Sequence, residues 1–267
     1  MEKLNGKRLS LLLLLLLALI LVPMAHAQTQ GESDLEYVRK KGKLIIGYTV
    51  YAPMNYTDEK GNFTGFDTEL AIIVTEKLGL EPQFVEIDWS TKEIELNAKA
   101  IDCIWNGLTI TEDRKANMEI TKPYVKNAQV VLMKKGAAYN GTASLIGKTV
   151  VAEQGSVGEE AIFADANLQK ADYIPKSVQT ECLIEVKAGT ADAAVLDLTL
   201  AKTMTGPGTS YSDLVIVDYL AEEDYGIAFR KGSDICAEVN KILDQLRADG
   251  TLAALAAKYG LDLADVE

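Results

Sequence analysis

The sequence has few of the side chains that build catalytic and metal sites. It contains one histidine, His26, and three cysteines, Cys103, Cys182 and Cys236, which lie too far apart for a metal knuckle. His26 falls in a segment that we expect to be removed, so the mature protein has no imidazole. Serine–histidine and cysteine–histidine nucleophile pairs and histidine metal sites are therefore excluded, and we expect neither a metal nor a cofactor.

The three cysteines are predicted to be small apolar fillers, because Cys103 and Cys182 have apolar neighbours. Their odd number means that at least one thiol stays free or pairs between chains. A Cys103–Cys236 disulfide is the alternative.

Long hydrophobic runs are also missing, except at the N-terminus. There, three basic residues precede the apolar run Leu9–Met24, and the small-x-small motif Ala25-His26-Ala27 follows. This order predicts a cleaved secretory signal over residues 1–27, with a membrane anchor as the alternative, although the run is short for a span. We expect a soluble, periplasmic or otherwise extracytoplasmic protein that begins near Gln28.

Positive charge is scarce as well. Removal of the signal segment takes away three basic groups and one acid, which changes the formal net charge from −12 to −14. So acidic a protein is a poor partner for nucleic acid or anionic lipid.

Short apolar runs alternate with amphipathic stretches from Lys43 onward. The expected strands cover 43–50, 82–87 and 100–105, with helices over 66–80 and 91–100 between them. This succession predicts an α/β fold with a largely parallel sheet. Two more helices, broken at Asp249-Gly250, are expected near the C-terminus and should pack on the first lobe defined below.

The pattern recurs, which indicates two lobes of related topology. Gly42-Lys43 opens one aliphatic run and Gly147-Lys148 opens another, and residues 100–111 align with residues 190–201. The alignment matches Asp102 with Asp192, Leu108 with Leu198 and Thr109 with Thr199, and it places Gly107 opposite Asp197. The last two lie just past the carboxyl end of a strand, where open α/β sheets bind ligands, so the ligand cleft is expected between the lobes.

Two segments, 127–135 and 218–232, are predicted to cross between the lobes. The chain would leave lobe 1, build lobe 2 and return. Lobe 1 then comprises residues 28–127 and 222–267, and lobe 2 comprises residues 128–221. Two crossings form a hinge that permits closure around a ligand.

The segment Ile104–Tyr124 carries groups suited to an anion. A strand that ends in Asn106-Gly107 exposes its backbone, because glycine has no Cβ. Thr109 offers an N–H and a hydroxyl. Arg114, on the next turn, offers the planar fork of donors that suits a carboxylate.

The second lobe offers complementary groups. The Gly-rich turn in Glu153–Ile162 enters a helix, so its N–H groups and the helix dipole also favour an anion. Asp197 supplies an acceptor for a cation. A carboxylate site and an ammonium site that face each other across a cleft are suited to an α-amino acid.

The mature chain resembles the periplasmic amino-acid-binding proteins of ABC importers, which belong to extracellular solute-binding family 3. The motifs that carry the likeness are YAPMNYTDEKGNFTGFDTELA, IDCIWNGLTITEDR, KPY, VVAEQGSVGEEA, GTADAAVLD and YGIAFRKG, in the family's order. The resemblance implies a two-lobed, non-enzymatic and monomeric binding protein of the periplasmic-binding-protein fold. Each lobe would be a βα sheet domain, the hinge would have two strands, and the partner would be a membrane permease.

The resemblance also implies roles for single residues. Arg114 and Thr109 would clamp the ligand carboxylate. Asp197 and the backbone of Gly107 would accept from the amino group.

Other residues of the family's site would surround the ligand. Tyr51 and Trp89 would flank its side chain, and Gly155-Ser156-Val157 would close from lobe 2. Many relatives have Thr where Val157 stands, so only the backbone N–H is expected to act at that position.

These roles have structural alternatives. Arg114 could be a solvated helix charge that pairs with a neighbouring acid, and Asp197 could cap the next helix. Tyr51 and Trp89 could be core aromatics. The recurring aspartates, Asp102 and Asp192, are expected to end helices or hold turns rather than to touch ligand.

Two other functions fit the fold. A dehydratase acting on cyclohexadienyl acids would need a general acid or base, and the candidates are Glu153 and Glu181. Asp197 argues against it, because such a substrate has no ammonium group for a buried carboxylate. A receptor's sensing domain would need a transmembrane helix and a signalling domain, and the chain to Glu267 has neither.

The ligand's side chain is the least determined feature. Tyr48-Thr49-Val50 lack the acid that follows the first strand in relatives binding lysine, arginine, histidine or glutamine. Glu153 stands where some relatives have an aliphatic residue. If Glu153 faces the cleft, it favours a basic ligand held between Tyr51 and Trp89. If it points to solvent, a neutral polar ligand such as glutamine or cystine is expected.

Overall fold

The structure is a computed structural model that describes residues 32–266. The predicted signal segment 1–27 lies outside this range. Residues Ser33–Glu267 form one compact unit, which contains both lobes. Within the described range, none of the helices has the length and apolar character needed to cross a membrane.

A sheet of nine strands runs through this unit. Its order is β4-β1-β5-β11-β7-β10-β8-β9, and β6 pairs with β11 beside this path. The strands are β1 (Lys43–Tyr48), β4 (Glu81–Glu86), β5 (Cys103–Thr109), β6 (Met118–Ile120), β7 (Val125–Lys134), β8 (Thr149–Glu153), β9 (Asp172–Lys176), β10 (Ala193–Asp197) and β11 (Leu214–Arg230), and a separate hairpin joins β2 (Tyr56–Thr57) to β3 (Phe63–Thr64).

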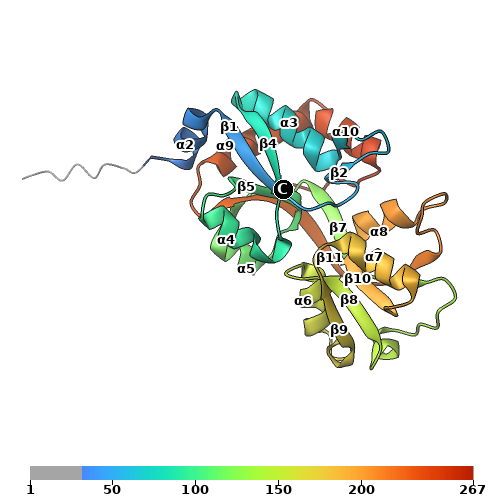
Figure 1. The fold of residues 1–267 in the computed structure, drawn as a ribbon. Coiled ribbons are helices and arrows are strands. Elements are labelled where there is room, and N and C mark those ends of the chain that lie inside the picture. Colours follow the sequence, from blue (N-terminus) through green and yellow to red (C-terminus); the bar gives the residue numbers. More distant parts are fainter. Residues whose placement is uncertain (1–31, 267) are drawn as a thin grey trace, which may run out of the picture. The chain divides into compact units, whose positions relative to one another are not determined.

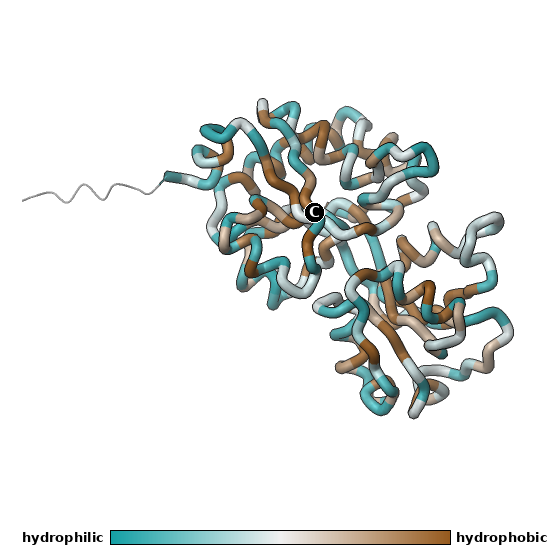
Figure 2. The backbone as a smooth tube through the Cα atoms, in the orientation of Figure 1, coloured by the Kyte–Doolittle hydropathy of each residue, from teal (hydrophilic) through white to brown (hydrophobic). Residues whose placement is uncertain are grey.

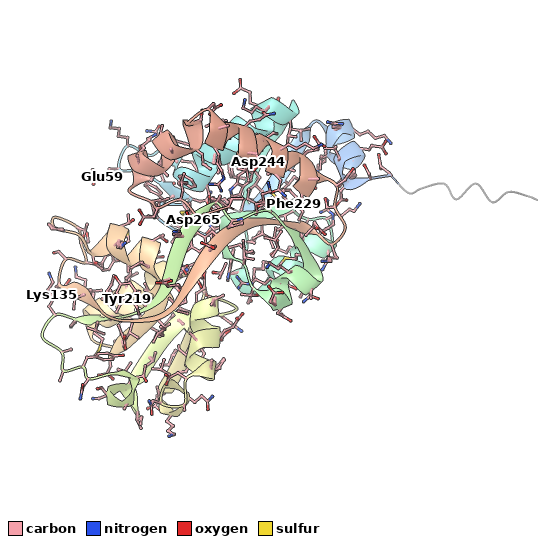
Figure 3. The ribbon with its side chains drawn as sticks, turned by 180° about the vertical axis from the view of Figure 1, so that it is seen from behind. Glu59, Lys135, Tyr219, Phe229, Asp244 and Asp265 are labelled. Atoms are coloured by element: carbon pink, nitrogen blue, oxygen red, sulfur yellow. The ribbon has the colours of Figure 1, made fainter. Side chains whose placement is uncertain are left out.

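The two lobes have the same strand order, as the repeat predicts. In lobe 1, β1 pairs in parallel with both β4 and β5, and in lobe 2, β8 pairs in parallel with both β9 and β10. The fourth strand of the order in lobe 1 is β11, which pairs antiparallel with β5. Its equivalent in lobe 2 is β7, which pairs antiparallel with β10. Figure 3 shows β7 and β11 side by side as they pass from one lobe to the other.

Helices cover the faces of this sheet, as Figure 1 shows. The α-helices are α2 (Asp34–Lys41), α3 (Phe66–Leu78), α4 (Lys92–Asn97), α5 (Glu112–Asn117), α6 (Val157–Ala164), α7 (Gln179–Ala188), α8 (Leu198–Thr205), α9 (Ile235–Ala248) and α10 (Thr251–Tyr259), with 3₁₀ turns η1 (Trp89–Thr91), η2 (Thr142–Leu145) and η3 (Leu168–Lys170). The C-terminal helices α9 and α10 contact α3, which confirms that they pack on lobe 1.

Two crossing strands were predicted, and both form. β7 and β11 pair over almost the whole length of β7, from Val125 with Tyr225 to Lys134 with Leu214. The sheets of the two lobes are therefore hydrogen-bonded into one. The predicted lobe boundaries face each other in this pairing, because Ala128 is the partner of Glu222. The boundaries themselves stay a prediction.

Buried apolar residues lie along the strands and on the helix faces that pack on them, and brown stretches run through both lobes in Figure 2. Cys103, Cys182 and Cys236 are all buried free thiols, so the three cysteines are apolar fillers and the alternative disulfide is not formed. The strand that contains Cys103 was predicted to end at Gly107, and this is wrong. β5 continues to Thr109 because Tyr225 of β11 pairs with Thr109.

The recurring aspartates make the same contact in each lobe. Asp102 takes the N–H of Ile45 through its carboxylate at 2.7 Å and donates its own N–H to the Ile45 carbonyl at 2.7 Å. Asp192 makes both bonds with Thr149, each at 2.9 Å. Each aspartate therefore ties the turn before the third strand of its lobe to the first strand. By this contact, Ile45 of lobe 1 is equivalent to Thr149 of lobe 2. Alignment of the two Gly-Lys pairs would instead place the equivalent of Ile45 one residue later.

Candidate functional site

One pocket brings together the nine residues that the sequence singled out. Their strands and turns end at the same place in the fold. The lining consists of Tyr51, Trp89, Gly107, Thr109, Arg114, Glu153, Ser156, Val157 and Asp197, together with Asn106 and Gln179. The pocket thus draws residues from both lobes, as a ligand cleft requires. The role of each residue toward a ligand stays a prediction.

Gly107 brings the backbone of β5 up to the pocket. It has a φ of +57°, and a Cβ there would lie 2.7 Å from Cε1 of Tyr51. Its N–H donates to Asp67 at 2.7 Å, and Asp67 also accepts from the Tyr124 hydroxyl at 2.9 Å. The positive φ and the short distance to Tyr51 together require glycine at position 107. Burial raises the pKa of Asp67 to about 7, because the carboxylate has lost water and no cation contacts it within this bond network.

Arg114 is held inside the pocket and not in solvent. Its side chain is 4 % exposed, and Nη1 donates to the Thr109 carbonyl at 2.9 Å. The neighbouring acid Glu112 pairs with Lys115 instead. Burial lowers the pKa of Arg114, the direction expected when a cation leaves water without a carboxylate in contact. The solvated-charge alternative for Arg114 is therefore wrong.

The hydroxyl of Thr109 is already engaged. It donates to Glu223 Oε1 at 2.9 Å, so it is not free to donate to a ligand carboxylate in this arrangement. Burial, followed by the charge of Asp197, raises the pKa of Glu223 to about 8. Glu223 lies on the crossing strand β11, and its link to the site could not be read from its position in the sequence.

Asp197 is the N-cap residue of α8 by position, yet its side chain makes no capping bond. The carboxylate instead accepts from three amides: Asn127 at 2.8 Å, Gln129 at 2.5 Å, and Gln179. Its pKa is raised, chiefly by burial. The capping alternative is wrong, and the amides fix a carboxylate that faces the pocket.

Glu153 ends β8 and points inward. It is 3 % exposed, and no residue of the described part of the chain donates to its buried Oε1. Burial and, after it, the charge of Asp197 raise the pKa of Glu153 well above its usual range. The solvent-facing alternative is therefore wrong. An unpartnered buried carboxylate oxygen is costly, so the pocket presents an unmet need for a donor or cation.

The turn Gly155-Ser156-Val157 closes on the pocket from lobe 2. The Gly155 carbonyl accepts from Nζ of Lys92 at 2.9 Å and from Nη2 of Arg114 at 3.4 Å, so the lobes are in contact here. Ser156 caps α6 through the Glu159 N–H at 3.1 Å. The Gly155 N–H is taken by the Glu159 carboxylate, so fewer N–H groups are available to an anion than the Gly-rich turn suggested.

Sequence reasoning gave no site role to Asn106 and Gln179, which line the pocket, or to Lys92, which bonds the Gly155 carbonyl of the closing turn. Asn106 ties the segment before Tyr51 to β5 through the Thr49 N–H at 3.1 Å. Gln179 is the first residue of α7, and Lys92 is the first residue of α4. These two helices are counterparts, because each connects the second and third strands of its lobe. The repeat is the one signal that could have pointed to both positions.

Glu181, the second acid proposed for a dehydratase, does not line the pocket. Its carboxylate accepts from the Ser177 N–H at 2.9 Å near the start of α7. Of the two candidate acids, only Glu153 reaches the cleft, where it lies among other charged groups.

Comparison with known proteins finds amino-acid-binding proteins along most of the chain. The chain is 30 % identical over 224 residues to the arginine-binding extracellular protein ArtP of Bacillus subtilis. The matched region covers 82 % of this chain and 86 % of ArtP. It is 28 % identical to the L-cystine-binding protein TcyJ of Escherichia coli, over 87 % of this chain and 88 % of TcyJ.

A solved structure shows the same fold. The substrate-binding protein of an ABC uptake transporter from Streptococcus pneumoniae, with bound histidine, superposes with a TM-score of 0.80 at 28 % identity and covers 89 % of this chain and 100 % of its own. Residues 44–262 match the bacterial extracellular solute-binding proteins of family 3, and the chain belongs to that family.

Proposed function

We propose that the cleft binds an L-α-amino acid with a cationic side chain, without chemical change, and that the closed monomer delivers it to the permease of an ABC importer outside the cytoplasm. The α-carboxylate would meet Arg114 from lobe 1. The ammonium would meet Asp197 from lobe 2 and the Gly107 carbonyl. The relatives that bind arginine, histidine and cystine support an amino acid as the solute.

The observation that carries the cationic preference is the buried Oε1 of Glu153. It lines the pocket and has no donor. A guanidinium or ammonium group would supply both the hydrogen bond and the charge, whereas an apolar side chain would leave the oxygen unpaired. Trp89 and Tyr51 also line the pocket, and the Trp89 ring already has a cation over it, Nζ of Lys92 at 4.9 Å from the ring centre.

Calorimetry of the mature protein against arginine, lysine, glutamine and cystine tests this function. Wild type should bind arginine or lysine most tightly. Glu153→Gln should lose at least about tenfold in affinity for these two and leave glutamine unchanged, because it removes the charge and keeps the shape. Glu59→Gln is the matched control, since this exposed acid lies in the turn between β2 and β3 and does not line the pocket.

Two results would count against the proposal. An unchanged order of ligands in Glu153→Gln would favour a neutral polar amino acid. Absence of binding to any amino acid, together with turnover of a cyclohexadienyl acid, would favour the dehydratase.

A further inference from the structure

Three buried hydroxyl groups from distant parts of the chain meet beside the pocket. Tyr51 follows β1 in lobe 1, Tyr225 lies on the crossing strand β11, and Thr199 lies in the first turn of α8 in lobe 2. Their exposed fractions are 2 %, 0 % and 6 %. Of the three, Tyr51 alone lines the pocket, so the other two would act on a ligand only through it.

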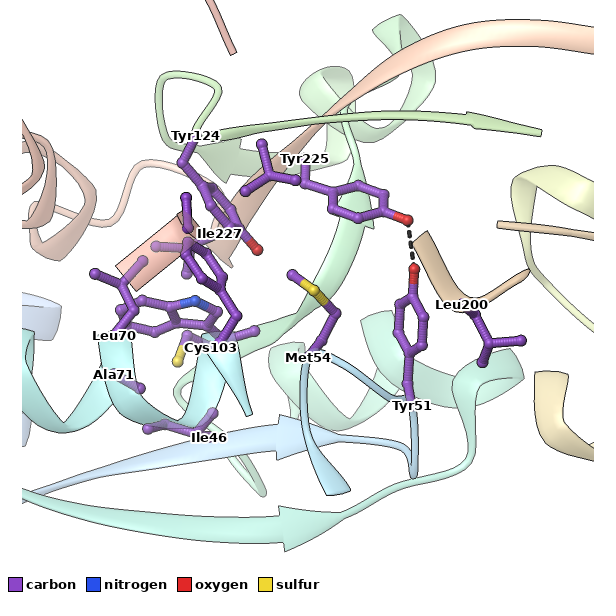
Figure 4. Close-up of a cluster of buried hydrophobic side chains, with 14 of the residues drawn as sticks. Ile46, Tyr51, Met54, Leu70, Ala71, Cys103, Tyr124, Leu200, Tyr225 and Ile227 are labelled. Atoms are coloured by element: carbon purple, nitrogen blue, oxygen red, sulfur yellow. Dashed lines mark hydrogen bonds between the residues drawn. The ribbon is translucent and has the colours of Figure 1, made fainter. Parts of the chain in front are cut away.

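The three hydroxyls form a closed ring of hydrogen bonds. The Tyr51 and Tyr225 oxygens are 2.6 Å apart, the bond drawn in Figure 4. Tyr51 also bonds Oγ1 of Thr199, and Oγ1 of Thr199 lies 3.2 Å from the Tyr225 oxygen. A hydroxyl has one donor, so a ring in which each donates once and accepts once satisfies all three protons. Removal of any one hydroxyl leaves a buried group short of a partner.

The ring also fixes the two aromatic side chains against the pocket backbone. A Cβ at Gly107 would lie 2.7 Å from the Tyr51 ring and 3.0 Å from the Tyr225 ring. Both rings therefore pack directly on the β5 backbone at the position where the ligand's amino group is expected. With its hydroxyl held as well, Tyr51 has little freedom to turn away from the pocket.

Thr199 is the repeat counterpart of Thr109, and the two threonines are used differently. Thr109 bonds Glu223 and lines the pocket of its own lobe. Thr199 instead places its hydroxyl on a residue of the other lobe, while its N–H is held by the Asn127 side chain at 3.1 Å. The position in lobe 2 that corresponds to a clamp residue in lobe 1 thus connects the lobes.

We propose that the hydroxyl ring is a closure latch. Thr199 joins Tyr51 and Tyr225 only when the lobes are closed, and the completed ring holds Tyr51 against the ligand's side chain. Thr199 and Tyr225 are positioning residues, because they reach the ligand only through Tyr51. The latch rests on the proposed function in one respect, that a ligand closes the cleft.

Stopped-flow kinetics with arginine, or with the amino acid that calorimetry finds to bind best, test the latch. Thr199→Val and Tyr225→Phe should each raise the dissociation rate constant about fivefold, the loss expected for one hydrogen bond. The association rate constant should stay within about twofold, because the ligand meets the open form before the ring is complete. Thr205→Val is the control, since that hydroxyl bonds the Ala201 carbonyl within α8.

A double variant separates a ring from two independent contacts. Because both substitutions break the same ring, Thr199→Val with Tyr225→Phe should raise the dissociation rate little more than the larger single effect. The latch alone would be overturned if the double variant's increase in dissociation rate equalled the product of the two single increases. It would also be overturned if both single variants bound ligand and released it at the wild-type rate. If wild type bound no amino acid, the proposed function would fail and the latch with it.

Discussion

The two lobes share one scaffold but present opposite charges to the cleft. The strand order is β4-β1-β5 in lobe 1 and β9-β8-β10 in lobe 2, so the strand that comes first in the chain lies in the middle of each. In both lobes an aspartate ties the turn before the third of these strands in the chain to the first. At the end of the third strand they diverge, because lobe 1 has Gly107 and lobe 2 has Asp197. One strand end thus brings a bare backbone to the pocket, and the other brings a carboxylate. The shared scaffold fixes where the pocket lies, and under the proposed function a few side chains would set which end of an amino acid each lobe takes.

The shared aspartates also differ in their surroundings. The Asp102 side chain is fully buried and pairs with Lys41 at 2.5 Å and with Arg230 at 3.5 Å. The Asp192 side chain is 43 % exposed, and its one ion pair within residues 32–266 is with Lys148, at 3.7 Å. The same backbone contact is therefore embedded in a buried ion-pair network in lobe 1 and lies in solvent in lobe 2.

The largest effect should come from breaking this contact in each lobe in turn. Asp102→Ala should lower the free energy of unfolding by about 3–5 kcal/mol, because it leaves the Ile45 N–H without its acceptor and takes the buried charge partner away from Lys41. Arg230 keeps its ion pair with Asp34 at 2.8 Å. Asp192→Ala should cost about 1 kcal/mol, chiefly the bond to the Thr149 N–H. Urea denaturation measures both. Equal losses would show that burial does not set the strength of this contact.

The charge difference at the cleft is tested next, from the side of lobe 1. Arg114→Ala should weaken amino-acid binding by about 3 kcal/mol, because the ligand carboxylate would lose its charged donors in a site with little water. Arg114→Lys should recover little, since an ammonium cannot reproduce the planar fork. Calorimetry measures both, and Lys115→Ala on the exposed side of α5 is the control. Wild-type affinity in Arg114→Ala would refute the clamp.

A smaller and more selective effect is expected from lobe 2. Asp197→Asn should weaken an amino acid by about 2 kcal/mol, since it removes the charge that faces the ammonium group. The matching acid without the amino group should lose much less. Competition binding with both compounds gives this ratio directly. An equal loss for the two compounds would mean that Asp197 acts by ordering Asn127, Gln129 and Gln179 and not by contact with the ligand.

The sequence by itself determined the two-lobed α/β scaffold. Apolar periodicity and helix stops are local, so the strand and helix order could be predicted, and the repeat placed Gly107 opposite Asp197. Arg114 could be placed near the pocket because its distance from the strand end is a local fact, and the family likeness implied its role as a clamp. The family likeness added Tyr51 and Trp89.

Only the tertiary structure decided which side chains face the cleft and what already occupies them. Glu153 could point to either side of its strand end until the packing of lobe 2 buried it. Gln179 lines the pocket and Lys92 bonds the Gly155 turn beside it because the helices that carry them begin there, which depends on how each helix packs on its sheet. The Thr109 hydroxyl is engaged by Glu223, 114 residues later in the chain. Such contacts depend on distances in space, which neither spacing nor composition encodes.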